Sequence, residues 1–549
     1  MPPTWNDLMK PLPGSLYRNG AWSLPLSWSA CKQLRSEIGE NLEIAPDLAE
    51  WAQAYLQHRA TIESAQRGEF QAPGLDPRLS PQQAAASTWM AWAGRVVMCT
   101  EMRTGKTPMT IEALEAINQW PVLLVVPNTT KFVWQQEFAE WAPNVATFVL
   151  HGTAAQRRKI LAEAEVARDA GLGVAVVTNW ESLRSSTRLA GYGSIKLSDK
   201  EKEEQMLNEF DWQVVVGDEA HRAVDPKSKQ SRGLKHLAHG APRRILLTGT
   251  PVRNDAADLY TLWNIVAPEE APEGRTKWIA RYTLSGPGRH GGWEVWGFKA
   301  EHRAELDEVF DPRFLRRTLR EMRPGMPDRL PDEVRRVQLE GKQEKLYRDL
   351  KKDMIAETDG GLLVVTDPIV LVNRLRFAAM ATPVVDEAGE VIELTTPSIK
   401  IDVLMETLEE GGDEPLVVFM ESRKMAELCE RELEKAGVMY TSIHGGIDPS
   451  MRAANIARFQ QGDAKVAICT VGAGAEGVTL NRASRTLFLQ IPYSNVQYLQ
   501  AKARTDGRVG GDPLESIHSV VAGTIEDSYL PILGGKNATL QEVLRDALR

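Results

Sequence analysis

Two short segments of the chain carry residue types that together could hydrolyse a nucleoside triphosphate. The first, residues 100–107, reads TEMRTGKT and follows a short apolar run. In a strand–loop–helix of this kind, backbone amides and the helix N-terminus face phosphates, while Lys106 supplies a positive charge and Thr107 a hydroxyl for Mg²⁺. The residues predicted to contact the nucleotide here are Met102, Arg103, Thr104, Gly105, Lys106 and Thr107.

The second segment, residues 214–221, reads VVVGDEAH and ends an apolar run on two adjacent carboxylates. Asp218 is predicted to hold Mg²⁺ through water, and Glu219 to orient and deprotonate the attacking water. Both act with Lys106, and the predicted cofactors are ATP and Mg²⁺. The phosphate loop of the first segment departs from its usual pattern, because Thr100 stands where Gly or Ala is usual. A surface turn that happens to contain Gly-Lys-Thr is therefore the alternative.

Apolar segments that alternate with helical stretches predict how these motifs are positioned. They indicate parallel sheets covered by helices on both faces, with ligands at the carboxyl ends of the strands. Residues 195–212 and 268–300 are predicted to be insertions. The predicted strands are 96–99, 122–126, 146–150, 174–178, 214–216 and 245–247 in a first region, and 416–420, 440–443, 466–469 and 486–489 in a second region without a phosphate loop.

Composition limits the class of protein further. The net charge of −9, from 65 basic and 74 acidic residues, argues against coating nucleic acid through bulk charge, but it allows a local basic groove. Four scattered cysteines without CxxC spacing favour a reducing compartment. Because we find neither an export signal nor a run of 18 apolar residues, we expect no membrane and a cytoplasmic location. Compact size without chromatin-binding appendages favours the cytosol of a bacterium or a phage-infected host.

The motifs taken together resemble those of superfamily-two DEAH-box helicases and translocases, and among them the Swi/Snf-type DNA-dependent ATPases. The segments that carry the resemblance in the first region are LSPQQ (79–83), VVPNTTKFVWQQEFAEW (125–141), VVTNWESL (176–183), DEAHRAVDPKSK (218–229) and LLTGTP (246–251). The resemblance implies that Gln83 reads the adenine edge. It implies that His221, Thr248 and Thr250 couple hydrolysis to movement, and that Thr129, Lys131 and Asn179 contact nucleic acid.

The second region follows the same family order. TVGAGAEGVTLNRAS (470–484) resembles the family's glycine-rich motif, and it implies nucleic-acid contacts at Thr470 and Gly474 and a nucleotide contact at Gly477. QAKARTDGRVG (500–510) resembles the arginine-finger motif. Its two arginines stand one residue further apart than in the family, so Arg508 and Arg504 both remain candidates for the finger.

The resemblance implies an α/β fold with two RecA-like parallel-sheet lobes, helical insertions and a small N-terminal α+β accessory domain. We predict the accessory domain at residues 1–72, the first, ATP-binding lobe at 73–320 and the second lobe at 321–549. A packing extension on the first lobe is the alternative for residues 1–72. A faint likeness of this part to a domain beside annealing-helicase motors depends on Trp22 and Pro25.

The expected function is an ATP-driven translocase or helicase-like motor that remodels duplex, forked or branched DNA, mostly through phosphate contacts. RNA is the less favoured partner. Two alternatives stay open: a strand-separating helicase on DNA or RNA, and an ATP-gated nucleic-acid-binding scaffold whose ATPase has degenerated.

Overall fold

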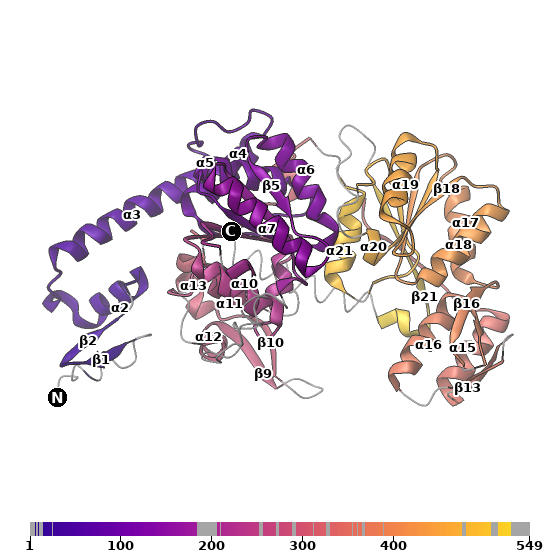
Figure 1. Cartoon of the computed structure of the whole chain (residues 1–549). Helices are drawn as coiled ribbons and strands as arrows, with labels where there is room; N and C mark the ends of the chain where they lie inside the picture. Colours follow the sequence, from indigo (N-terminus) through magenta and orange to yellow (C-terminus); the bar gives the residue numbers. More distant parts are fainter. Residues whose placement is uncertain are drawn as a thin grey trace. The chain divides into compact units, whose positions relative to one another are not determined.

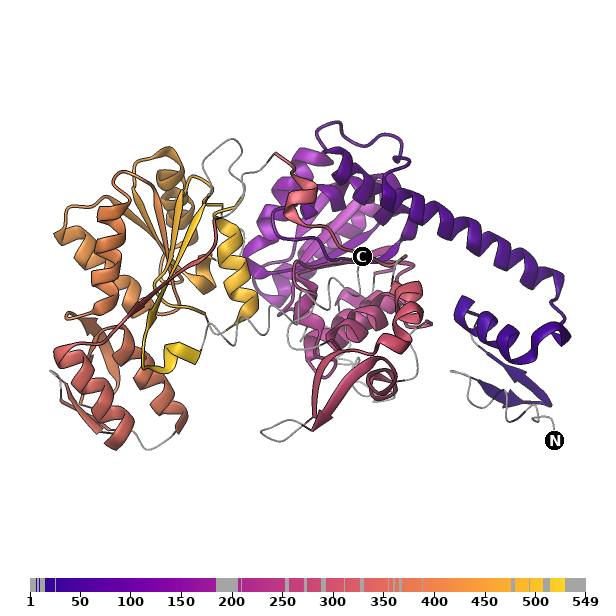
Figure 2. The same ribbon diagram turned by 180° about the vertical axis from the view of Figure 1, so that it is seen from behind.

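The strands expected from apolar runs form two separate parallel sheets. The computed structural model describes the chain apart from residues 1–5, 7–8, 10–14, 25, 184–205, 209, 252–255, 271–273, 288–292, 311, 326–329, 354, 359–360, 365–367, 388, 475–478, 493, 507–513 and 529–549. One compact unit reaches to Met322, and the other begins at Arg323. Each unit contains one of the two sheets (Figures 1 and 2).

The first unit holds a seven-stranded parallel sheet in the order β11-β3-β8-β7-β4-β6-β5. Its inner strands are buried along nearly their whole length, as expected for a parallel sheet with helices on both faces. This order places β3, β8 and β7 side by side, so their carboxyl ends adjoin. The strands are β3 (Arg95–Met98), β4 (Val122–Val126), β5 (Ala146–Val149), β6 (Val174–Asn179), β7 (Val214–Asp218), β8 (Arg243–Leu247) and β11 (Phe314–Leu315).

Helices cover both faces of this sheet. On one face α4 (Pro81–Ala93), α5 (Lys106–Ile117) and α6 (Lys131–Trp141) bury Trp89, Met109 and Phe138 against alternate strand residues. On the other face α10 (Lys229–Gly240) brings Leu234 against Gly217 and Leu246. The remaining helices of the sheet are α7 (Ala154–Asp169), beside β5 and β6, and α11 (Asp258–Val266), beside β3 and β8.

The N-terminal part of this unit is a hairpin followed by two helices, as the α+β prediction expects. Its elements are β1 (Leu16–Arg18), β2 (Ala21–Ser23), α2 (Trp28–Ile38) and α3 (Pro46–Arg67). The long helix α3 buries Ile62 and Ala65 near its end, where it packs on α4. An ion pair of 2.7 Å between Lys32 and Glu308 joins α2 to α13 (Arg303–Phe310).

The described part of the predicted insertion at 268–300 forms a helix and a hairpin that pack around a buried tryptophan. It contains α12 (Arg275–Tyr282) and the antiparallel hairpin β9 (Thr283–Pro287) and β10 (Trp293–Phe298). Trp278 is fully buried and its ring lies 5.7 Å from that of Tyr260 in α11. Most of the insertion predicted at 195–212 lies outside the described residues.

The second unit holds a six-stranded parallel sheet in the order β12-β21-β20-β17-β19-β18. One face is covered by α17 (Ile399–Glu410) and α18 (Arg423–Lys435), and the other by α19 (Pro449–Gln461) and α21 (Asn495–Arg504). The strands are β12 (Glu333–Val337), β17 (Leu416–Met420), β18 (Tyr440–Ile443), β19 (Val466–Thr470), β20 (Arg485–Phe488) and β21 (Glu515–Val521).

Two further helices and two hairpins complete this unit between β12 and α17. They are α15 (Gly341–Asp353), α16 (Pro368–Met380), the hairpin β13 (Ile355–Thr358) with β14 (Gly361–Val364), and the hairpin β15 (Thr382–Val385) with β16 (Val391–Thr395). The predicted fold class, α/β with two RecA-like parallel-sheet lobes, is confirmed. Each predicted strand is present within about two residues of its expected ends, whereas β11, β12 and β21 were not predicted.

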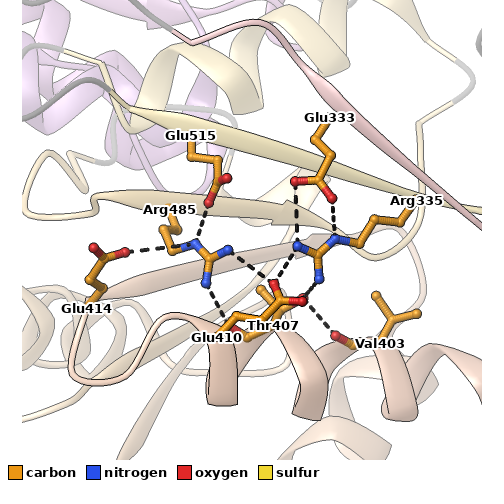
Figure 3. A network of polar contacts seen from close by, with 8 residues as sticks. All are labelled: Glu333, Arg335, Val403, Thr407, Glu410, Glu414, Arg485 and Glu515. Carbon is orange, nitrogen blue, oxygen red and sulfur yellow. Dashed lines mark hydrogen bonds and ion pairs between the residues drawn. The ribbon is translucent and has the colours of Figure 1, made fainter.

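A polar network ties the amino ends of three strands of the second sheet to α17 (Figure 3). Arg485 begins β20, and its guanidinium is hydrogen-bonded to Glu515 at the start of β21 and to the carbonyl of Thr407 in α17, the latter at 2.8 Å. Glu410 of α17 bonds both Arg485 and Arg335 of the edge strand β12. Since nucleotide sites lie at the opposite, carboxyl ends of such sheets, we assign this network to stability.

Arg485→Met is expected to lower the free energy of unfolding of the second unit by about 2–4 kcal/mol. The Arg485 side chain is only 9% exposed, but its partners Glu410 and Glu414 are 50% and 56% exposed and stay hydrated without it. Urea unfolding followed by circular dichroism measures the effect. The matched control is Arg423→Met, which breaks an exposed helix pair with Glu427 and is expected to cost under about 1 kcal/mol. Equal losses would contradict the assignment.

Candidate active site

The Gly-Lys-Thr loop joins the end of β3 to the start of α5, at the carboxyl edge of the first sheet. Lys106 is the first residue of α5, and Gly105 before it has a left-handed backbone with φ +88°. A Cβ atom at Gly105 would lie 2.4 Å from Nε2 of Gln83, so a side chain there would strain the backbone and displace the Gln83 amide. Arg103 is also left-handed, with φ +63°. The loop therefore has the tight turn that a phosphate cradle requires.

Gln83 holds this loop from α4. Its Nε2 donates to the carbonyl of Thr104 at 2.9 Å, and its Oε1 accepts from the amide of Ser80 at 2.9 Å, as part of a capping box. Both ends of the amide are thus engaged within the protein. The predicted contact of Gln83 with adenine stays a prediction, and its contact with the loop is the observed one.

Thr100, the departure from the usual loop pattern, has a structural explanation. Its side chain is completely buried, and its hydroxyl accepts a hydrogen bond of 3.0 Å from the hydroxyl of Thr104. The ammonium of Lys106 lies on the same part of the loop and donates to the carbonyls of Thr100 and Glu101 at 3.1 and 2.9 Å. The loop is consequently ordered by its own side chains, and Lys106 points back over it.

The two adjacent carboxylates lie at the end of β7, two strands away from the loop strand. Burial and the negative charge of Glu219 raise the pKa of Asp218 to about 6. A hydrogen bond of 3.1 Å from the indole of Trp134 and the positive charge of Lys106 act in the opposite direction. Asp218 and Lys106 therefore interact electrostatically across this edge of the sheet.

The donor set fits a magnesium nucleotide. A carboxylate kept from water beside a second negative charge is disfavoured, and a divalent cation there would remove that penalty. Magnesium commonly takes one or two carboxylates together with substrate phosphates. Within the described residues, no three His, Cys, Asp or Glu side chains gather into an all-protein metal cage. Asp218 and the Thr107 hydroxyl are the groups that would hold the ion.

Glu219, His221, Thr248 and Thr250 come together as the coupling prediction expects. Glu219 has a left-handed backbone with φ +53°, and its Oε2 lies 3.2 Å from Nδ1 of His221. The same ring nitrogen lies 3.4 Å from the hydroxyl oxygens of both Thr248 and Thr250. His221 is only 7% exposed. The acidic segment is therefore linked to the turn after β8.

The turn after β8 also packs on the phosphate loop, so the loop, the acidic segment and the turn form one continuous site. A Cβ atom at Gly249 would lie 3.0 Å from Cγ of Met102 in the loop. The nucleotide-loop, catalytic and coupling residues predicted in the first unit thus occupy one edge of one sheet. Their roles toward a nucleotide remain predictions.

Two tryptophans shape the acidic end of the site without having been predicted to do so. Nε1 of Trp134 donates to Oδ2 of Asp218, and Nε1 of Trp180 donates to the carbonyl of Asp218 at 2.9 Å. Both side chains are almost completely buried. A large buried ring with a polar N–H needs a partner. That rule could have suggested such a contact, but the sequence does not name the partner.

The predicted nucleic-acid contacts of the first unit follow β4 and β6. Asn179 ends β6 and donates through Nδ2 to Oδ1 of Asn128 at 3.0 Å, while Thr129 is exposed. Lys131 is buried, and its ammonium donates to the carbonyl of Leu150 at 3.2 Å. Thr129 is exposed, Asn179 is half-buried with its amide bonded to Asn128, and Lys131 is engaged inside the unit, so the three nucleic-acid contacts stay predictions.

The second unit positions three further predicted residues. Thr470 ends β19, Gly474 ends the short helix α20 (Val471–Gly474), and Arg504 ends α21. The carbonyl of Arg504 accepts from the amide of Leu480 at 3.0 Å. Gly477 and Arg508 lie outside the described residues. The choice between Arg504 and Arg508 as the finger therefore stays open.

The chain thus has two parallel-sheet units, and the first carries a phosphate loop beside an acidic strand end. The chain belongs to the SNF2-related domain family, which matches residues 82–381, and the helicase conserved C-terminal domain matches residues 399–510. The predicted family is thereby confirmed. Among the described residues, no helix combines the length and the hydropathy needed to cross a lipid bilayer.

Individual relatives are distant. The chain is 24% identical over 504 residues to the chromodomain-helicase-DNA-binding protein 3 homolog of Caenorhabditis elegans, covering 86% of this chain and 27% of that protein. It is 24% identical over 446 residues to the DNA annealing helicase and endonuclease ZRANB3 of Mus musculus, covering 80% and 38%. It spans well under half the length of these curated relatives. Among solved structures, the Sulfolobus solfataricus SWI2/SNF2 ATPase core in complex with dsDNA is similar at 19% identity and a TM-score of 0.38, covering 87% of this chain and 96% of that one.

Proposed function

We propose that this chain is an ATP-dependent translocase that moves on DNA and remodels duplex, forked or branched substrates. The observation that carries the proposal is the continuous arrangement of the phosphate loop, Asp218, Glu219, His221 and the Thr248–Thr250 turn within a member of the SNF2-related domain family. ATP with Mg²⁺ is the proposed cofactor. The mouse relative is itself described as a DNA annealing helicase.

In the proposed reaction the loop amides and Lys106 bind the phosphates, and Thr107 with Asp218 holds the ion, which neutralises charge on the phosphates when bound. Glu219 accepts a proton from the attacking water. His221 contacts both the Glu219 carboxylate and the hydroxyls of Thr248 and Thr250. A movement of the carboxylate during hydrolysis therefore shifts the imidazole and, through it, the turn after β8. Arg504 or Arg508 stabilises charge on the transferring phosphoryl group.

Three further assignments belong to this proposal. Residues 1–72 form an accessory domain, 73–320 the ATP-binding lobe and 321–549 the second lobe. Thr129, Asn179, Thr470 and Gly474 lie along the DNA track and contact mostly phosphates, with Lys131 reaching it only if its present bond to Leu150 is released. The protein acts in the cytoplasm of a bacterium or phage-infected cell, which agrees with its four free cysteines.

Steady-state ATP hydrolysis with blunt duplex, forked DNA, single strands, RNA and no nucleic acid tests the proposal. We expect duplex or forked DNA to raise kcat at least about tenfold, and Lys106→Ala to abolish turnover under all conditions. Stimulation by single strands alone would favour the strand-separating helicase. Absence of turnover with every nucleic acid would favour the ATP-gated scaffold and overturn the proposal.

A further inference from the structure

The phosphate loop contains a carboxylate that the proposed chemistry does not use. Glu101 is the second residue of TEMRTGKT, and its side chain is 37% exposed. A negative charge in a loop that binds polyanionic phosphates is unfavourable unless a cation compensates it. Glu101 is therefore expected to have a fixed partner and a reason for its position.

The partner is Arg316. It lies in residues 313–319, by which the chain leaves the first unit and which we call the exit segment. Nη2 of Arg316 donates to Oε1 of Glu101 at 2.8 Å, and the amide of Leu319 donates to Oε2 at 2.7 Å. Nη1 of Arg316 also donates to the carbonyl of Cys99 at 3.0 Å. The Arg316 side chain is only 10% exposed. Both oxygens of the carboxylate are thus held by residues more than two hundred positions away in the chain.

Backbone pairing continues this attachment along the loop. The amides of Val97, Cys99 and Glu101 donate in turn to the carbonyls of Arg313, Leu315 and Arg317, at 2.7, 2.8 and 3.0 Å. Strand β3 ends at Met98, so the pairing extends beyond the strand into the loop itself. The segment then ends in α14 (Leu319–Met322), whose Met322 is 1% exposed, and the next residue starts the second unit.

Glu101 also touches Lys106, the group proposed to bind the phosphates. Its carbonyl accepts from the ammonium of Lys106 at 2.9 Å, while its amide and its carboxylate bond the exit segment. All three polar groups of this residue are therefore used, one toward Lys106 and two toward residues 316–319. A displacement of the exit segment therefore moves the backbone of Glu101, whose carbonyl accepts the hydrogen bond from Lys106.

We propose that Glu101 and Arg316 are positioning residues that fix the phosphate loop to the exit segment, so that movement of the second unit alters how Lys106 is presented to the nucleotide. The inference depends on the proposed function and adds a route by which the second unit regulates the first. A loosened loop still offers its amides and Lys106 to a bound nucleotide, but it no longer holds them at the geometry that the transition state needs.

The test uses the full chain with Glu101→Ala, Arg316→Ala, the double variant and Glu101→Gln. We expect each single variant to lower duplex-stimulated kcat by about tenfold to a hundredfold, with the dissociation constant of a fluorescent ATP analogue changed less than about threefold. The double variant is expected to lose no more than either single variant, because the two residues act as one unit. Glu101→Gln keeps the bond from Leu319 and is expected to lose less.

A second readout does not depend on turnover. Hydrogen–deuterium exchange of residues 99–106 and 313–319 is expected to accelerate in all three alanine variants, but not in Arg281→Ala, which breaks the exposed pair with Glu305 on α12 and α13. Unchanged exchange of the loop overturns the inference. If the fold losses in kcat of the two single variants multiply in the double variant, the two residues act independently and the inference is overturned. If nucleic acid does not stimulate wild-type turnover, the proposed translocase function fails. The exchange measurement still shows whether Glu101 and Arg316 fix the phosphate loop to the exit segment.

Discussion

Replacing Glu219 by glutamine is expected to lower kcat for ATP hydrolysis about 10²–10⁴-fold while nucleotide binding persists. Glutamine keeps the shape of the side chain but cannot accept a proton from water. The backbone of Glu219 is left-handed, with φ +53°, and such strain in a residue other than glycine costs about 1–3 kcal/mol. The surrounding structure maintains it and aims the carboxylate at His221, 3.2 Å away.

Turnover at saturating ATP, Mg²⁺ and duplex DNA measures this effect, and titration with a fluorescent ATP analogue measures binding. Glu163→Gln serves as the matched control, because Glu163 is 55% exposed on α7 and pairs only loosely with Lys159, at 4.0 Å. We expect the control to keep wild-type kcat. A Glu219→Gln enzyme within tenfold of wild type would assign the proton acceptor to another group.

The strands that sequence predicted are those whose apolar residues are continuous. Strand β4 reads VLLVV and has the predicted bounds, since every side chain in it is buried. Strand β12 reads EVRRV, and its Arg335 and Arg336 make it look like a surface segment. It is an edge strand, and Arg335 is neutralised by Glu333 and Glu410, which no local pattern indicates. Strand β11 has two residues, too few for any periodicity.

The predicted site residues share a different property: each belongs to a short motif with its own chemistry. His221, Thr248 and Thr250 could be placed together because parallel strands end at the same edge. The Trp134–Asp218 and Arg316–Glu101 contacts join residues 84 and 215 positions apart. In such cases a single sequence predicts that the polar or charged side chain needs a partner, but it does not identify which residue that partner is. Gln83 illustrates the converse, because its motif suggested a ligand contact and the structure uses its amide to hold the loop.

The second large effect is expected at a buried ion pair in the second unit. Lys400 near the start of α17 is completely buried, and its ammonium donates to Oε2 of Glu526 at 2.7 Å and to the carbonyl of Ser519 at 2.9 Å. Burial lowers the pKa of Lys400, and the charge of Glu526 opposes that shift. The same carboxylate oxygen accepts from the amide of Val521 at 3.0 Å. The pair therefore ties α17 to strand β21 and the turn after it.

Glu526→Leu is expected to lower the free energy of unfolding of this unit by about 3–5 kcal/mol, because it leaves an ammonium buried without its counter-charge. Lys400→Met is expected to cost a similar amount by stranding the carboxylate. The double variant Lys400→Met with Glu526→Leu is expected to regain most of the loss, since an apolar pair of similar volume avoids the desolvation of both charges. Losses that simply add in the double variant would contradict this account.

Tryptophan content allows the two units to be followed separately in that experiment. All 15 tryptophans lie at or before Trp296, so intrinsic tryptophan fluorescence reports the first unit, whereas circular dichroism reports both. If the pair acts within the second unit, urea unfolding of Glu526→Leu shifts the dichroism transition and leaves the tryptophan transition near its wild-type midpoint. An equal shift in both signals would mean that the two units unfold together, and the 3–5 kcal/mol would then be a property of the whole chain.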